Sequence, residues 1–195
     1  YEFIPMSEFE CENSNAISIK DVKIDVNYAL VITTNSGLWR YLIGDTIKFT
    51  SLDPYRIKIT GRTKHFINVF GEELIIENTE DALKIACDNN NAEITDYTVA
   101  PIFMVGKDKG SHEWMIEFKK EPENLEQFAT DLDLALQKIN SDYEAKRYKN
   151  MTLSFPTVHA CKKGTFYQWL KSKNKLGGQH KVPRMSNNRI LMEDL

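Results

Sequence analysis

The chain has 195 residues, of which 42% are hydrophobic, 11% aromatic and 27% charged, and its formal net charge is −3. This composition excludes collagen-like, low-complexity and disordered proteins, and the length suffices for one large domain or two small ones. No apolar run approaches the roughly 18 residues of a membrane helix, so we expect no membrane association.

Residues 1–60 are rich in β-branched residues and turns, which predicts a small, barrel-like β subdomain. Within it, two apolar runs over 21–45 flank Asn35-Ser36-Gly37, a sequence that tolerates positive φ, so we expect a hairpin. Residues 56–60 alternate in hydropathy like a short strand. The chain begins at Tyr1 inside an apolar run, and we interpret it as the C-terminal piece of a longer protein.

From Gly61 onward the pattern changes to mixed helices and strands, which predicts a second domain over 61–195. A second hairpin is expected over 64–76, and Asn78-Thr79 can cap a helix that ends near Asp88. Alternating apolar residues then predict two strands. These strands are expected over 95–106 and 113–119.

The most regular helix is expected after a cap at Asn124, because apolar residues recur there every three or four positions. These residues are Leu125, Phe128, Leu132, Ala135, Leu136, Ile139 and Tyr143. We expect Asp131 and Asp133 on its solvated face. A strand over 151–160 and a short helix from about 165 to 172 follow. The element order predicts an α+β domain with helices on one face of a mainly antiparallel sheet.

The tail differs in charge from the rest of the chain. Residues 1–161 hold 17 Lys/Arg and 26 Asp/Glu, whereas residues 162–195 hold 8 Lys/Arg and 2 Asp/Glu. A basic tail on an acidic body indicates that the tail meets an anion. That anion could be a nucleic acid, an acidic lipid surface, a phosphorylated small molecule or the acidic body itself.

Cationic residues in this tail, Lys181, Arg184 and Arg189, lie near Gly177-Gly178 and Pro183. A cationic loop with free backbone is suited to a developing negative charge, as in acyl or phosphoryl transfer. Aromatic residues nearby could stack on bases. However, Phe166, Trp169 and Leu170 have the spacing of a packed helix face, so we do not expect nucleic acid as a partner.

Cysteine and histidine give no metal or disulfide pattern. The three cysteines form no C-x-x-C pair, and the four histidines are dispersed. We therefore expect no metal ligands in this chain and reduced thiols, as in a cytoplasmic protein.

Two further stretches depart from ordinary packing sequences. In RYLIGDTI, Asp45 follows Gly44 at the end of an apolar strand, where its carboxylate can accept hydrogen bonds from a vicinal diol. An ordinary turn is the alternative. In GRTKHFINVFGEEL, Gly61 lies at the composition change, where a rotation axis is plausible, and the Arg62 fork suits phosphate or carboxylate. A solvated connector is the alternative there.

Taken in order, four blocks resemble the C-terminal part of the auxin-responsive Gretchen Hagen family of acyl acid–amido synthetases, within the adenylate-forming ligases. The blocks are YEFIPM, TTNSGLWRYLIGDTIKF, GRTKHFINVFGEELIIENTEDAL and GGQHKVPRMSNNR, and they look like its prokaryotic branch. The resemblance covers nearly the whole chain. It implies that 1–60 ends the large adenylating domain and that 61–195 is a mobile C-terminal cap domain.

The resemblance implies a ligase that uses ATP and Mg²⁺ to join a carboxylic acid to an amino acid through an acyl-adenylate. It implies that Asp45, Tyr41 and Arg62 bind ATP. Lys64 is similar to the hinge position, and Lys181 to the catalytic lysine that approaches the α-phosphate.

The family's phosphate loop and metal-associated glutamate would lie in a missing N-terminal domain upstream of Tyr1, so this piece alone is expected to be inactive. One alternative is a thioester-forming relative that uses coenzyme A. Another is a non-catalytic module whose basic tail binds a partner or nucleic acid.

Overall fold

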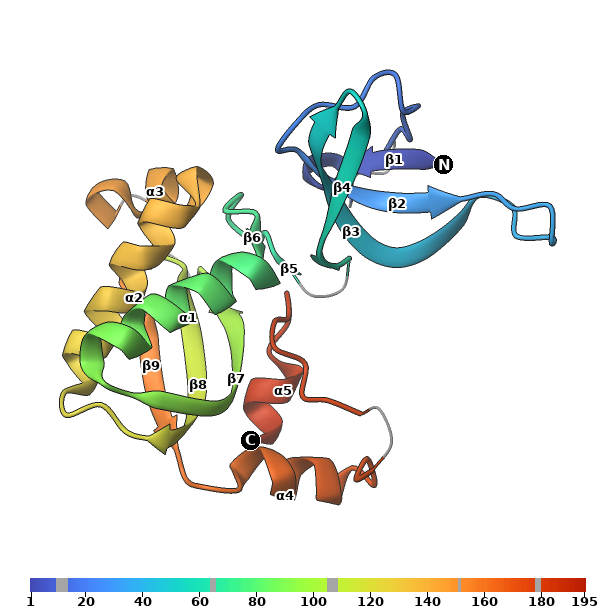
Figure 1. Cartoon of the computed structure of the whole chain (residues 1–195). Coiled ribbons are helices and arrows are strands. Elements are labelled where there is room, and N and C mark those ends of the chain that lie inside the picture. The colour runs from blue at the N-terminus through green and yellow to red at the C-terminus, as the bar shows by residue number, and fades with distance from the viewer. Residues whose placement is uncertain (10–13, 64–65, 105–108, 151, 178–179) are drawn as a thin grey trace. The chain divides into compact units, whose positions relative to one another are not determined.

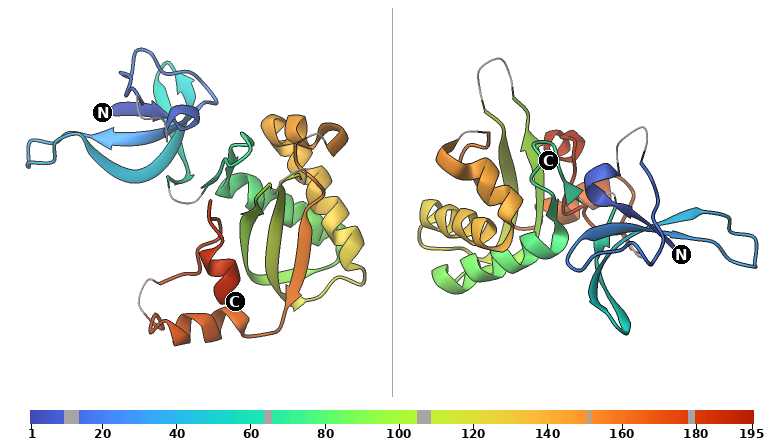
Figure 2. Two further views of the ribbon diagram at one scale, coloured as in Figure 1. Left: turned by 180° about the vertical axis from the view of Figure 1, so that it is seen from behind. Right: turned by 90° about the horizontal axis from the view of Figure 1, so that it is seen from above.

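The computed structural model describes residues 1–9, 14–63, 66–104, 109–150, 152–177 and 180–195. The chain divides into two compact units, Tyr1–Phe66 and Ile67–Leu195 (Figures 1 and 2). The fold is α+β, as expected. None of the described helices has the length and apolar character needed to cross a membrane.

The first unit is a four-stranded antiparallel sheet in the order β1-β2-β3-β4. Its elements are β1 (Glu2–Pro5), the 3-10 turn η1 (Met6–Glu8), β2 (Asn27–Ile32), β3 (Tyr41–Leu52) and β4 (Tyr55–Arg62). The expected hairpin is confirmed, because β2 and β3 pair with Asn27 opposite Lys48.

The expected barrel is wrong in one respect, because in the described residues the sheet is open and β1 and β4 are its edges. Four strands are too few to curl around a packed interior. The core instead lies on one face of the sheet, where the ring of Phe3 meets that of Phe49 edge-on at 5.1 Å and Tyr28 and Ile47 are buried.

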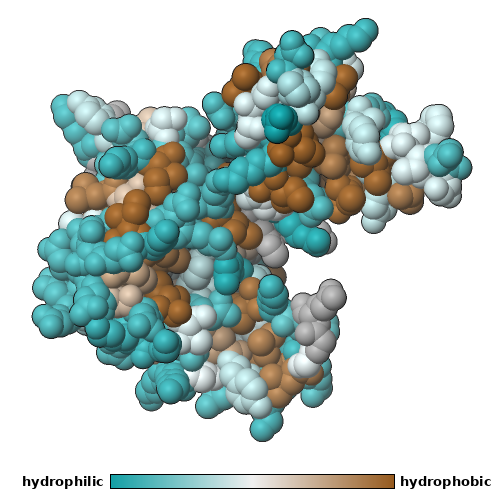
Figure 3. Space-filling view, viewed as in Figure 1, coloured by the Kyte–Doolittle hydropathy of each residue, from teal (hydrophilic) through white to brown (hydrophobic). Residues whose placement is uncertain are grey.

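This core continues to an exposed margin on β4. Ile57 and Ile59 lie opposite the buried Phe49 and Ile47, so they share their face, yet they are 53% and 68% exposed. Figure 3 shows apolar surface on the face of the first unit that is turned to the viewer.

The second unit has a three-stranded sheet in the order β7-β8-β9, antiparallel between β7 and β8 and parallel between β8 and β9. Figures 1 and 2 show α1 and α2 together over one face of it. The strands of this sheet are β7 (Glu93–Ile102), β8 (Ser111–Lys120) and β9 (Thr157–Cys161). A separate two-stranded sheet pairs β5 (Phe66–Ile67) with β6 (Leu74–Ile75), where the chain passes from the first unit to the second. Its helices are α1 (Ile76–Asn90), α2 (Leu125–Ile139), α3 (Ser141–Arg147), the 3-10 turn η2 (Tyr148–Asn150), α4 (Thr165–Ser172) and α5 (Ile190–Asp194).

The apolar face of α2 forms the centre of the second core, as its spacing predicts. The Asn124 side chain caps the helix by accepting from the backbone N–H groups of Glu126 and Gln127 at 2.9 and 3.1 Å. Phe128 and Leu132 are fully buried. These contacts fix α2 against the sheet.

Three expected boundaries are wrong. The helix α2 stops at Ile139, because Asn140 is extended and its side chain accepts from the Tyr143 N–H at 2.8 Å, which starts α3. The helix α1 begins at Ile76, and Asn78 instead accepts from the Ile75 N–H within its first turn. The strand expected over 151–160 begins only at Thr157.

Asp133 was expected on the solvated face of α2, and this is wrong because it is only 3% exposed. Arg147 forms a two-pronged pair with its carboxylate, with both N···O distances 2.7 Å, and the Tyr143 hydroxyl donates to it at 2.8 Å. A carboxylate with this many donors tolerates burial.

Candidate functional site

The hairpin of β3 and β4 brings Asp45 and Arg62 together. The register places them opposite each other, and Arg62 Nε lies 3.2 Å from Asp45 Oδ1. Beside them, the Thr63 N–H donates to the Gly44 carbonyl at 2.9 Å, and Gly44 has φ +86°. A side chain at this φ would be strained, so glycine lets the strand turn here.

The Asp45–Arg62 pair is accessible to a ligand. The side chains of Asp45 and Arg62 are 28% and 66% exposed. The carboxylate can accept from two adjacent hydroxyls, and the guanidinium can donate to a phosphate or carboxylate. Tyr41 starts the same strand β3 and is half exposed. The neighbouring Leu42 is 39% exposed, so this end of the strand offers apolar as well as polar surface.

The structure describes only one of the other two predicted site residues. Lys64 lies outside the described residues. Lys181 belongs to the second unit, where its side chain is exposed. The structure therefore joins Asp45 to Arg62 by direct contact, and it describes Lys181 within a different unit.

The chain after Lys181 runs along the free edge of β7. The Arg184 carbonyl accepts from the Val99 N–H at 2.9 Å, and the Ser186 N–H donates to the Val99 carbonyl at 3.2 Å. The Thr98 hydroxyl adds a bond to the Pro183 carbonyl at 2.8 Å. This short segment is thus held as a parallel addition to the sheet.

Two of the three singled-out cations of the tail pair with the acidic body. Arg184 bonds with Glu80 and lies 3.8 Å from Asp96. Arg189 pairs with Glu113 at 2.6 Å and also donates to a backbone carbonyl at 3.1 Å. The acidic body is therefore one anion that the basic tail meets. Sequence reasoning left this open, because pairing across distant elements depends on the tertiary fold.

Burial and charge shift the pKa values around the tail. Burial raises the pKa of the Asp96 carboxyl above its ordinary value, against the lowering effects of the Tyr97 N–H and the Arg184 charge. Burial also raises the pKa of Tyr97 to about 12. For Glu113, burial acts upward, but the bonds from Arg189 and His159 lower the pKa overall.

Sequence reasoning missed a buried hydrogen bond between Glu72, in the Gly71-Glu72-Glu73 turn, and His112 on β8. Glu72 and His112 are 0% and 1% exposed and lie 2.8 Å apart, and Glu72 also accepts from the Phe70 N–H at 2.7 Å. The turn signal marked the hairpin but gave no sign of burial. Within the described residues, no group of three or more His, Cys, Asp or Glu is placed to hold a metal ion.

Comparisons with known proteins place this geometry in context. The family model described as the GH3 family C-terminal domain matches residues 77–190, and the GH3 family central domain matches residues 1–62. An indole-3-acetic acid-amido synthetase, GH3.3 of Arabidopsis thaliana, is 24% identical over 99% of this chain and 34% of its own length. A jasmonoyl–L-amino acid synthetase, GH3.5 of Oryza sativa subsp. japonica, is 29% identical over 98% of this chain and 36% of its own length.

The fold is similar to that of a solved GH3.15 acyl acid amido synthetase, with a TM-score of 0.69 and 19% identity. That match covers 100% of this chain and 35% of the solved one. A second structure of this synthetase, in complex with 2,4-DB, gives a TM-score of 0.66 at 18% identity. The chain thus spans about a third of the length of the relatives that it matches.

Proposed function

This chain belongs to the GH3 family, and we propose that the whole protein is an ATP-dependent acyl acid–amido synthetase. In the first step, a substrate carboxylate oxygen attacks the α-phosphorus of ATP, which forms an acyl-adenylate and releases pyrophosphate. In the second step, an amino acid's amine attacks the acyl carbon, loses a proton and displaces AMP. Activation is needed because a carboxylate is a poor electrophile, whereas AMP is a good leaving group.

The observation that carries this proposal is the accessible Asp45–Arg62 pair, built by strand register at the end of the β3–β4 hairpin. In the proposal, Asp45 accepts hydrogen bonds from the ribose hydroxyls of ATP, while Arg62 and Tyr41 flank the nucleotide. Lys181 stabilises the negative charge that develops on the α-phosphate. Lys64 is the proposed hinge, and Mg²⁺ would be held by residues upstream of this chain.

We also propose that residues 1–60 end the large adenylating domain and that 61–195 form the mobile cap domain. The division into two compact units supports this organisation. The apolar margin formed by Ile57 and Ile59 supports contact with an upstream part of the protein, because exposed apolar residues of this kind mark interfaces. The piece described here would therefore be inactive alone.

The acceptor proposed is an amine because the matched relatives are named amido synthetases. Release of AMP that depends on coenzyme A instead of an amino acid would favour a thioester-forming ligase.

The free thiols of Cys87 and Cys161 support a reducing compartment, such as the cytoplasm.

The test uses the full-length protein and measures acid-dependent exchange of pyrophosphate into ATP over a panel of carboxylic acids. Asp45→Asn is expected to raise KM for ATP at least about 10-fold, since a charge-assisted bond contributes about 1.5–3 kcal/mol. Asp53→Asn is the matched control, because Asp53 lies exposed in the turn at the other end of the same hairpin. Equal exchange by the wild type and Asp45→Asn contradicts the ATP-binding role of Asp45.

Arg62→Ala is tested in the same assay against Arg56→Ala, an exposed arginine on the same strand. The Arg62 variant alone is expected to weaken exchange. No exchange with any acid, together with no release of AMP, overturns the synthetase proposal itself.

A further inference from the structure

Lys181 is an exposed residue with a firmly anchored neighbour. Val182 is 5% exposed and packs in a small apolar cluster with Phe166 of α4 and Leu191 of α5. The backbone is therefore fixed directly after Lys181, while its ammonium group remains accessible. Such an arrangement suits a cation that must be presented at a defined position.

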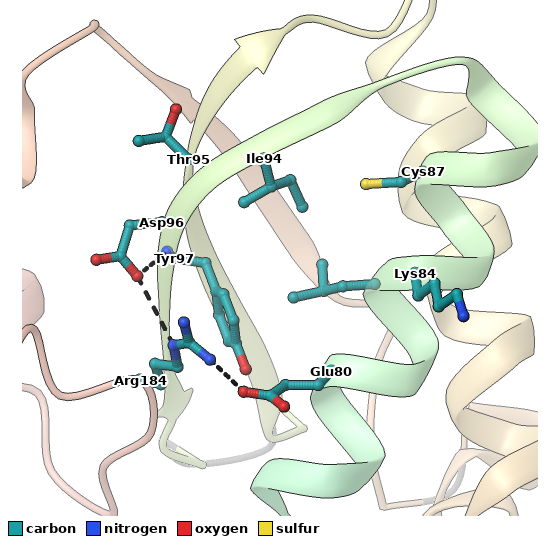
Figure 4. Close-up of a pocket in the computed structure, with 9 residues that line it drawn as sticks. Glu80, Lys84, Cys87, Ile94, Thr95, Asp96, Tyr97 and Arg184 are labelled. Carbon is teal, nitrogen blue, oxygen red and sulfur yellow. Dashed lines mark hydrogen bonds and ion pairs between the residues drawn. The ribbon is translucent and has the colours of Figure 1, made fainter.

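A second anchor lies two residues after Val182, at Arg184. Figure 4 shows its guanidinium between Glu80 on α1 and Asp96 on β7, with the Tyr97 ring alongside. The guanidinium carbon lies 5.3 Å from the centre of that ring. Together these residues help to line a pocket of about 230 Å³ between α1 and β7.

Main-chain bonds to β7 add to the side-chain contacts of Arg184. Its carbonyl accepts from the Val99 N–H at 2.9 Å, and the preceding Pro183 carbonyl accepts from the Thr98 hydroxyl at 2.8 Å. Side-chain and main-chain contacts therefore converge on this residue from α1 and β7. Without the Arg184 side chain, the segment that leads back to Lys181 would keep its main-chain bonds to β7 and the packing of Val182, but it would lose its contacts with α1.

The ion pairs of Arg184 are exposed, so we expect them to orient its side chain and to add little to the free energy of unfolding. The side chains of Arg184 and Glu80 are 42% and 47% exposed. Ion pairs in such positions are screened by solvent and contribute little to folding. A planar guanidinium held by two carboxylates nevertheless has a defined orientation, which an ammonium group would not reproduce.

We propose that Arg184 is a positioning residue for the adenylation step, because its contacts with Glu80 and Asp96 fix the chain segment that presents Lys181. This inference rests on the proposed function, in which Lys181 meets the α-phosphate of ATP. Arg184 itself touches no reacting atom. Its effect is confined to the half-reaction in which Lys181 acts.

The experiment measures the two half-reactions of the full-length protein separately. Pyrophosphate exchange reports adenylation, and AMP release from a preformed acyl-adenylate with the amino acid reports amide formation. Arg184→Ala is expected to lower kcat for exchange about 10- to 100-fold, the effect of misplacing a group by about 1 Å. KM for ATP should change less than about 2-fold, and the second half-reaction should be unchanged.

Three further variants sharpen the test. Arg184→Lys keeps the charge but lacks the planar guanidinium, so its kcat for exchange should lie between those of the wild type and Arg184→Ala. Glu80→Gln should impair exchange in the wild type but add little in the Arg184→Ala background, because the two side chains act through one contact. Lys171→Ala removes an exposed charge from α4 and serves as the control, with wild-type exchange expected.

Lys181→Ala separates the inference from the proposal on which it rests. If Lys181→Ala loses exchange and Arg184→Ala does not, the positioning role is overturned and the proposed function stands. If Lys181→Ala keeps full exchange, the role of Lys181 in the proposed function is overturned. If Arg184→Ala slows both half-reactions equally, Arg184 has only a general structural role, which also overturns the inference.

Discussion

At the scale of single residues, the carboxylate of Asp133 shows how the fold accommodates a buried charge. It is buried and receives donors from Arg147 and Tyr143. Its spacing from Ala129 and Leu136 is that of the buried face of α2. The apolar spacing therefore placed Asp133 on the buried face, but a carboxylate is ordinarily exposed. The donors from Arg147 and Tyr143 account for its burial.

Arg147→Met is expected to destabilise the chain strongly, because it leaves the Asp133 charge buried without its partner. Breaking a buried pair in this way costs about 3–5 kcal/mol of unfolding free energy. Urea unfolding followed by circular dichroism measures the loss. Lys138→Met, at an exposed position of α2, should change the free energy of unfolding little. Equal stability of the two variants would contradict the importance of the pair.

Asp96→Asn is expected to stabilise the chain near neutral pH. Burial raises the folded-state pKa of Asp96 above its ordinary value of 3.8, so the ionised carboxylate disfavours the folded state above that folded-state pKa. Asparagine removes this penalty and can still accept from the Tyr97 N–H. Unfolding by urea at a series of pH values should show the gain at pH 7.

The gain from Asp96→Asn should shrink as the pH falls and disappear below about 3.8, where the carboxyl group is protonated in both the folded and unfolded states. Glu123→Gln, before α2, is the control. A variant that is less stable than the wild type at pH 7 would show that the contact with Arg184 outweighs the effect of burial.

At the scale of elements, the sequence predicted those whose signals are local. The Asn124 cap and the regular apolar spacing of α2 gave its start, and the helix α4 follows its expected range. The break at Asn140 was missed, because the spacing continues through Tyr143 into α3. The helix α5 was missed as well, since five residues carry too little periodicity.

Asn124→Ala is expected to lower the unfolding free energy by about 1 kcal/mol, because two N–H groups in the first turn of α2 lose their acceptor. Thermal or urea unfolding measures this change. Glu121→Ala, an exposed position shortly before the helix, provides the comparison. If both substitutions have the same effect, the cap contributes nothing specific.

The candidate site was only partly accessible to sequence reasoning. The turn between β3 and β4 sets the register that brings Asp45 opposite Arg62, so local signals came close to this pair. The contacts of Arg184 with Glu80 and of Arg189 with Glu113 join residues far apart in the chain. Composition showed that the tail was basic, but only the fold identifies these carboxylates.

At the scale of the whole molecule, the charge asymmetry of the chain is partly resolved within it. Residues 162–195 hold 8 Lys/Arg against 2 Asp/Glu. Two of these cations, Arg184 and Arg189, pair with carboxylates of the acidic body. A nucleic acid would have to displace those carboxylates before it could contact the two guanidinium groups.

The chain is therefore expected to bind single-stranded DNA only weakly. Fluorescence anisotropy with a labelled oligonucleotide should show binding that vanishes between about 50 mM and 200 mM salt. Lys181→Ala should leave this weak binding unchanged. Binding that persists at the higher salt and is lost in Lys181→Ala would instead favour a nucleic-acid module.

The stretch of the tail that pairs with β7 covers a strand edge that could otherwise bind another chain. Val99 lies on an edge strand, and its N–H and carbonyl are occupied by Arg184 and Ser186. An unprotected strand edge is a template for pairing with another chain. A protease cut or frameshift that removes the tail would uncover this template, so such truncated chains should self-associate through β7 and precipitate.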